Sequence, residues 1–89
     1  MYTYAKYKKW AVSEDGQRQF LSIRDRVNLA IKDNGCITMD HAIKGESGLN
    51  FEMLACVDRL VELGEILEVK NPYSEYSQHR IFVDKRLGA

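Results

Sequence analysis

The hydrophobic pattern of this chain changes its period at Gly64, and that change constrains the class of fold. Before Gly64, apolar residues recur at helical spacing over 51–63. The residues that form this stripe are Leu54, Val57, Leu60 and Val61. After Gly64, residues 65–70 and 79–84 are rich in β-branched and aromatic side chains, and a turn-rich stretch at 71–78 separates them. The sequence therefore predicts an α+β chain whose helices are followed by an antiparallel hairpin.

Two further helices are predicted ahead of this point. The first covers 22–34, with Ser22 as its cap and a glycine after its last residue. A very short extended piece follows at residues 36–37. Thr38 can cap a second, short helix over 39–44.

The first twenty residues allow two interpretations. Asp15-Gly16 is a hairpin signal where alternating strands flank it, but the flanking residues do not alternate cleanly. Aromatic residues over 3–11 are spaced as regularly for a helix, and we expect a helix or an irregular arm there. Residues 85–89 are expected to form a frayed tail.

Length and composition limit the class of protein. Eighty-nine residues suffice for one small core. Two cysteines are too few for a disulfide scaffold, and no apolar run is long enough to span a bilayer. We therefore expect a cytoplasmic protein that has no membrane partner.

The sequence contains no recognisable catalytic or cofactor motif. It lacks a glycine-rich phosphate loop and a G-x-S-x-G elbow, so we expect neither enzyme activity nor a cofactor. Cys36, His41, Cys56 and His79 are metal-ligand types, but their spacing is wide and irregular. The sequence therefore predicts no metal site.

The order of the predicted elements resembles the winged helix-turn-helix superfamily. The segment Leu49 to Ile66, with its L-x-x-x-G-x-I ending at Leu60, Gly64 and Ile66, carries most of the likeness. The resemblance implies three helices and a C-terminal two-stranded wing over 22–84, with an N-terminal extension at 1–21 and a tail at 85–89. It also implies double-stranded DNA as the partner, which such a domain reads by placing its third helix in the major groove.

For the DNA-binding function we expect basic and aromatic side chains to make the contacts. The chain would then be a transcriptional regulator or a mobile-element accessory protein. A homodimer would fit this function, because paired half-sites match a two-fold protein. The predicted contacts are Arg59, Tyr73, Arg80, Lys8, Lys9, Arg24 and Arg26.

The charge pattern supports an alternative. Residues 1–44 hold eight basic and five acidic residues, and residues 45–89 hold five basic and eight acidic ones. Acids on the third helix would repel phosphates, so that helix could instead bind a protein. The residues predicted for this protein-binding face are Glu52, Met53, Cys56, Asp58 and Glu62. Cys56, if exposed, would be reactive.

Overall fold

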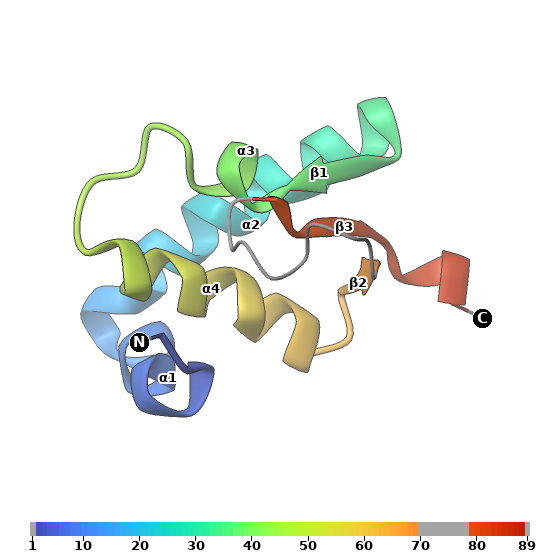
Figure 1. Cartoon of the computed structure of the whole chain (residues 1–89). Helices are drawn as coiled ribbons and strands as arrows, with labels where there is room; N and C mark the ends of the chain where they lie inside the picture. Colours follow the sequence, from blue (N-terminus) through green and yellow to red (C-terminus); the bar gives the residue numbers. More distant parts are fainter. Residues whose placement is uncertain (1, 70–78, 89) are drawn as a thin grey trace.

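Figure 1 shows a computed structural model of the chain, which describes residues 2–69 and 79–88. Along these residues the elements are α1 (Tyr4–Val12), α2 (Glu14–Asn34), β1 (Cys36–Thr38), α3 (Met39–Ile43), α4 (Asn50–Glu62), β2 (Ile66–Val69), β3 (Ile81–Asp84) and the short 3-10 helix η2 (Lys85–Gly88). The predicted α+β class is confirmed. The turn-rich stretch expected at 71–78 lies outside the described residues.

The sheet has three antiparallel strands in the order β1-β3-β2. Only two strands were expected, and that prediction is wrong because β1 also pairs. Ile37 lies opposite Phe82 on one side of β3, and Glu68 lies opposite Phe82 on the other. The short extended piece is thus an edge strand that joins the hairpin to the helices.

The helix predicted from Ser22 begins eight residues earlier, at Glu14. Its cap is Ser13, whose Oγ accepts a hydrogen bond from the Gly16 amide at 2.9 Å and donates to the Trp10 carbonyl at 2.7 Å. A Cβ built on Gly16 would lie 1.7 Å from that carbonyl oxygen, so only glycine fits. Asp15-Gly16 therefore forms a tight corner between two helices, and the hairpin interpretation is wrong.

The helix expected near residues 3–11 is present as α1. At the other end of the chain, the tail expected to be frayed forms η2 through Gly88. Asp84 accepts a hydrogen bond from the Arg86 amide at 2.8 Å, which holds the start of this turn. Thr38 caps α3 as predicted, because its Oγ1 accepts from the His41 amide at 3.2 Å.

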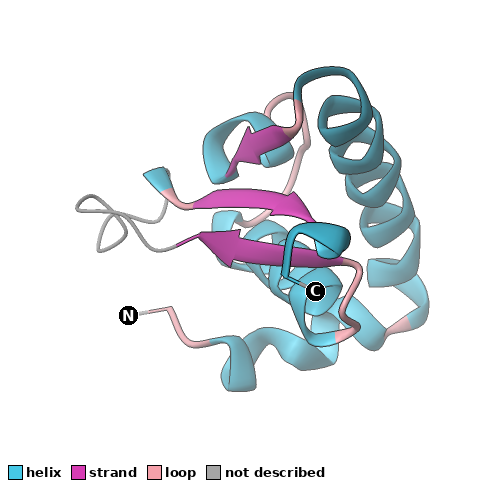
Figure 2. Ribbon diagram, turned by 90° about the vertical axis from the view of Figure 1, so that its right-hand side faces the viewer, coloured by secondary structure: helices cyan, strands magenta, loops and turns pink. Residues whose placement is uncertain are grey.

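The core lies between α2, α4 and one face of the sheet. Helix α2 contributes a stripe of apolar residues at helical spacing, and the sheet contributes Ile37, Ile66 and Phe82. Figure 2 is viewed from the sheet side, with α4 behind the strands. The long helices α2 and α4 therefore cover one face of the sheet, while the short η2 contacts β2 and β3 and lies in front of the strands in Figure 2.

Candidate functional site

Helix α1 and the residues before it pack on the outward side of α4. The Tyr2 hydroxyl donates to Asp58 Oδ2 at 2.5 Å, and the Tyr4 hydroxyl donates to Glu62 Oε1 at 2.8 Å. Lys8 Nζ forms an ion pair with Glu62 Oε2 at 2.8 Å. The basic and aromatic N-terminal segment is thus bonded to the acids of the third predicted helix.

An aromatic cluster accompanies these polar contacts. The ring centroids of Tyr2 and Tyr7 lie 5.9 Å apart, and each lies within 5.6 Å of the Phe51 ring centroid. Aromatic pairs at such separations add to the free energy gained from burial. Apolar packing therefore holds the N-terminal segment in place alongside its hydrogen bonds.

These contacts shift the pKa values of Tyr2, Tyr4 and Glu62. Burial, followed by the hydrogen bond to Asp58, raises the pKa of the Tyr2 hydroxyl. Burial and the bond to Glu62 raise the pKa of Tyr4 to about 12. Hydrogen bonds from Lys8, Tyr4 and Arg59 lower the pKa of Glu62 to about 2. Near neutral pH, the neutral Tyr4 phenol therefore donates to the ionised Glu62 carboxylate.

Two arginines predicted to contact DNA are paired with acids. Arg59 Nη1 lies 2.5 Å from Glu62 Oε1. Arg80, whose side chain is 15% exposed, lies 2.7 Å from both Asp58 and Glu68 and above the Phe82 ring. A guanidinium held by two carboxylates cannot form the usual bidentate contact with guanine unless it releases them.

Arg26 is also bound within the chain. Its Nη2 lies 3.2 Å from Glu46 Oε2, and its Nη1 donates to the carbonyls of Ala42 and Lys44. Together with Lys8, four of the predicted DNA contacts are thus engaged with protein groups.

Two other residues predicted to contact DNA, Lys9 and Arg24, lack such pairing in the part of the chain that the structure describes. Lys9 is exposed and Arg24 half-exposed, and neither has an acidic partner among residues 2–69 and 79–88. Tyr73 lies outside the described residues.

Within the predicted protein-binding face, Glu62 is exposed as expected, but the expected exposure of Met53 and Cys56 is wrong. Met53 is 8% exposed and Cys56 fully buried, while Glu52 and Asp58 are half-buried. Burial raises the pKa of the Cys56 thiol to about 12, which leaves no reactive thiolate there. The apolar stripe alone could not predict this, because other segments also cover α4.

Sequence reasoning missed the outer face of the sheet. Side chains alternate between the two faces along a strand. The residues that precede and follow Ile37 and Phe82 in their strands therefore point away from the helices. In register across the three strands, this face carries Cys36, Val83 and Leu67 in one row and Thr38, Ile81 and Val69 in the next. All six side chains are uncharged, and all are half-buried or exposed. The sequence did hold a signal for this face. Alternate residues of 66–69 and 81–84 point to opposite faces of the strands, and the residues of the outer face are all uncharged.

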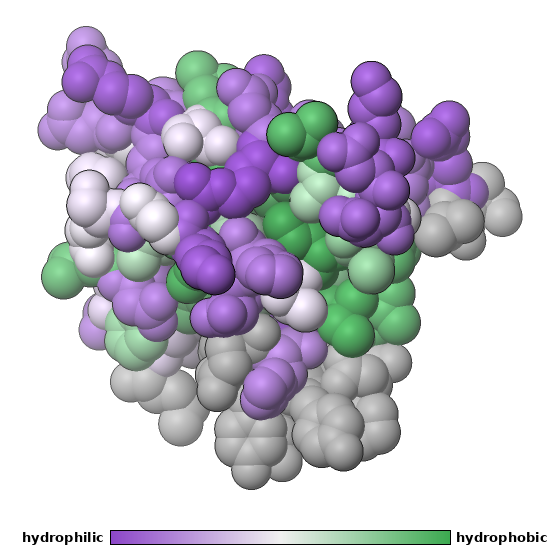
Figure 3. Space-filling view, turned by 90° about the horizontal axis from the view of Figure 1, so that it is seen from above, coloured by the Kyte–Doolittle hydropathy of each residue, from purple (hydrophilic) through white to green (hydrophobic). Residues whose placement is uncertain are grey.

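Figure 3 shows hydrophobic residues gathered on the side of the molecule where β2 and β3 lie. Val69 is 40% exposed. Contiguous apolar surface of this kind is typical of contact sites.

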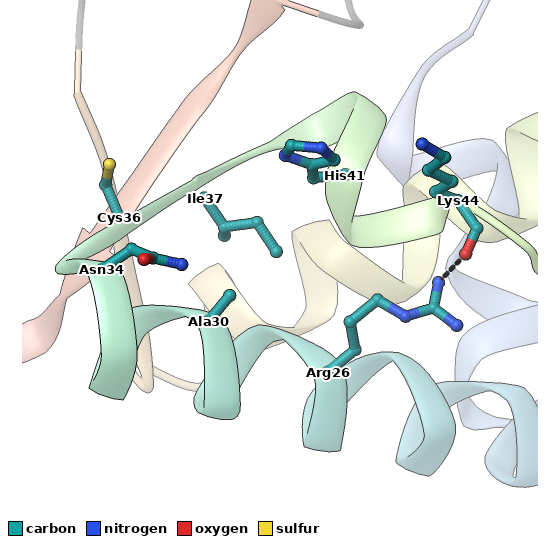
Figure 4. Close-up of a pocket in the computed structure, with 7 residues that line it drawn as sticks. All are labelled: Arg26, Ala30, Asn34, Cys36, Ile37, His41 and Lys44. Atoms are coloured by element: carbon teal, nitrogen blue, oxygen red, sulfur yellow. Dashed lines mark hydrogen bonds between the residues drawn. The ribbon is translucent and has the colours of Figure 1, made fainter.

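A separate hollow of about 370 Å³ lies between α2, β1 and α3 (Figure 4). Seven side chains line it: Arg26, Ala30, Asn34, Cys36, Ile37, His41 and Lys44. Cys36 and His41, which were considered as metal ligands, both line the hollow, and Cys36 lies at the end away from Arg26 in Figure 4.

Within the described part of the chain, no group of three or more His, Cys, Asp or Glu side chains could hold a metal ion. None of the helices described is long and apolar enough to cross a membrane. No protein-family model, curated protein or solved structure matches the chain.

Proposed function

We propose that this chain is a winged-helix domain that works as a protein-interaction module, and that its partner binds the outer face of the sheet. The observation that carries the proposal is the absence of charge from the six outward side chains of the described strands. Nucleic acid requires cations to neutralise its phosphates, and this face offers none.

One feature supports the winged-helix assignment. The order helix, short strand, short helix, helix and two strands from α2 to β3 is the order that the resemblance implies. The pairing of β1 with β3 departs from the two-stranded wing that the resemblance implies.

The α1–α4 contact argues against base reading by α4. Asp58 and Glu62 lie on the covered side, where Tyr2, Tyr4 and Lys8 already bind them. A helix entering the major groove needs its outward side chains free to reach base edges. Opening that side would also present two carboxylates to DNA, which is repulsive.

The sheet face suits a protein partner. The centres of protein interfaces are depleted in charge and packed with apolar side chains, as these two rows are. Strand β2 also supplies a neighbouring edge, because its one partner among the described strands is β3.

Site-specific photocrosslinking tests this function. A photoreactive residue replaces Val69 on the sheet or, as the matched control, Leu21 on α2, which is exposed to a similar extent, 43% against 40%. We expect one discrete adduct from position 69 in cells and none from position 21. Adding Leu67→Lys to the chain labelled at 69 should abolish the adduct while changing the free energy of unfolding by less than about 1 kcal/mol. Equal labelling from both positions, or an adduct that survives Leu67→Lys, would contradict the proposal.

DNA binding without base reading is a second candidate, and the free cations on α1 and α2 favour it. Lys9 and Arg24 could neutralise phosphates, because neither is paired with an acid in the part described. In that case Lys9→Ala and Arg24→Ala should each lower the slope of log affinity against log salt by about 1. Arg59→Ala is the control and should leave the slope unchanged, because Glu62 already holds that guanidinium.

A further inference from the structure

The hollow between α2, β1 and α3 has an apolar floor and a cationic rim. Ala30 and Ile37 form the floor, while Asn34, His41 and Lys44 stand around it (Figure 4). A volume of about 370 Å³ falls within the range of small-molecule sites. The hollow lies apart from the α1–α4 contact.

Arg26 forms a rigid wall of this hollow. The carbonyls of Ala42 and Lys44 and the Glu46 carboxylate fix its guanidinium, so it loses little further freedom when a ligand binds. Glu46 offsets one positive charge, but its carboxylate does not line the hollow.

The other polar groups of the rim retain unused donors. The Lys44 ammonium, the His41 ring and the Asn34 amide have no hydrogen-bond or ion-pair partner within residues 2–69 and 79–88. No carboxylate is among the seven lining residues. The lining therefore carries net positive charge and several N–H donors above an apolar base.

We propose that this hollow binds a small organic anion, in which a carboxylate or a phosphate monoester is attached to a compact apolar body. The anionic group is bound by Lys44 and His41. The body lies on Ala30 and Ile37, and the Asn34 amide donates to it or to the anion. The five residues given a role here, Ala30, Asn34, Ile37, His41 and Lys44, are not among the six side chains of the sheet face.

NMR titration of the isotope-labelled full chain tests the site. Phenyl phosphate and benzoate are the two probes that combine an apolar ring with an anionic group. Benzyl alcohol has the ring without the anion, and inorganic phosphate has the anion without the ring. We expect phenyl phosphate or benzoate to shift the Asn34 side-chain amide, the His41 ring and the Ala30 methyl. Benzyl alcohol and inorganic phosphate should bind at least about fivefold more weakly, since each lacks one half of the interaction. The stronger of the two anions identifies the natural head group.

Lys44→Ala should weaken the better probe about fivefold. The matched control is Lys32→Ala, an exposed lysine of α2 that does not line the hollow, and its affinity should equal that of the wild type. Three results would overturn the proposal: benzyl alcohol binding as tightly as the anions, equal weakening by the two lysine variants, or shifts at these residues with a DNA duplex and with none of the small anions.

Discussion

The α1–α4 contact and the outer face of the sheet differ in their polar groups. On α4, Asp58 and Glu62 are bound by two phenols and a lysine of the N-terminal segment, by Arg80 ahead of β3 and by Arg59 of α4 itself. On the outer face of the sheet, two rows of side chains carry no charge and do not pack on the core. One side is bonded within the chain, and for the other we propose a binding partner.

This difference changes the meaning of the charge pattern. The basic first half and the acidic second half suggest a dipolar surface that could orient a partner. In the folded chain, Lys8 and Arg26 of the basic half pair with Glu62 and Glu46 of the acidic half. A charged residue in a sequence is therefore weak evidence for a binding site until its partner within the chain is known.

The largest effect is expected at the corner that places α1 on α4. Gly16→Ala puts a methyl group into the Trp10 carbonyl, so α1 must move and the free energy of unfolding should fall by about 3 kcal/mol. Urea denaturation measures the change. Arg18→Ala, an exposed site on the same helix, serves as the control and should stay within about 0.5 kcal/mol of the wild type. Equal midpoints for the two variants would show that α1 does not depend on this corner.

The next effect is expected at Asp58. Asp58→Ala leaves the Tyr2 hydroxyl and part of the Arg80 guanidinium without an acceptor, which should cost about 2 kcal/mol. A double-mutant cycle with Tyr2→Phe should give a coupling energy of about 1 kcal/mol. Additive losses would mean that Tyr2 does not hold the N-terminal segment on α4.

A pH-dependent effect is expected at Glu62, whose pKa of about 2 lies below the ordinary value of 4.5. A lowered pKa in the folded chain stabilises it fully above about pH 4.5, and that stabilisation is lost as the pH falls towards 2. The difference in urea midpoint between the wild type and Glu62→Gln should therefore shrink over this range. In a Lys8→Met, Tyr4→Phe background two of the three donors are absent, so the difference should depend less on pH. A difference that stays constant down to pH 2 would contradict these bonds.

The smallest change in stability is expected on the sheet. Leu67→Lys should alter the free energy of unfolding by less than about 1 kcal/mol, because edge strands tolerate lysine and Leu67 does not pack on the core. Calorimetry of the full chain measures this. A loss comparable to that of Gly16→Ala would show that the outer face is part of the folded core and is unavailable to a partner.

Much of the fold followed from the sequence because local signals were strong. Thr38 as a cap, the stripe of α4 and the change of period at Gly64 each depend on neighbouring residues alone. The third strand, by contrast, required β1 to pair with β3 across more than forty residues of chain, which no local pattern specifies.

The candidate site was predicted less well, for the same reason. Arg80 looked available to DNA because its partner Asp58 is distant in the sequence. Arg59 looked available because its partner Glu62 was assigned to the alternative, protein-binding face. Met53 and Cys56 looked exposed because the stripe of α4 showed where the main core lies, but not that other segments cover the remaining sides. The uncharged rows of the sheet became evident only once the register was known.

A titration of the labelled full chain with duplex DNA at low salt, followed by NMR, tests the central claim most directly. We expect no shifts of the Glu52 amide or the Arg59 side chain, even at large excess, because α1 closes the face that would enter the groove. Shifts of these α4 groups that disappear at moderate salt would show that α4 contacts DNA, and would contradict the assignment of this domain to protein binding through its sheet.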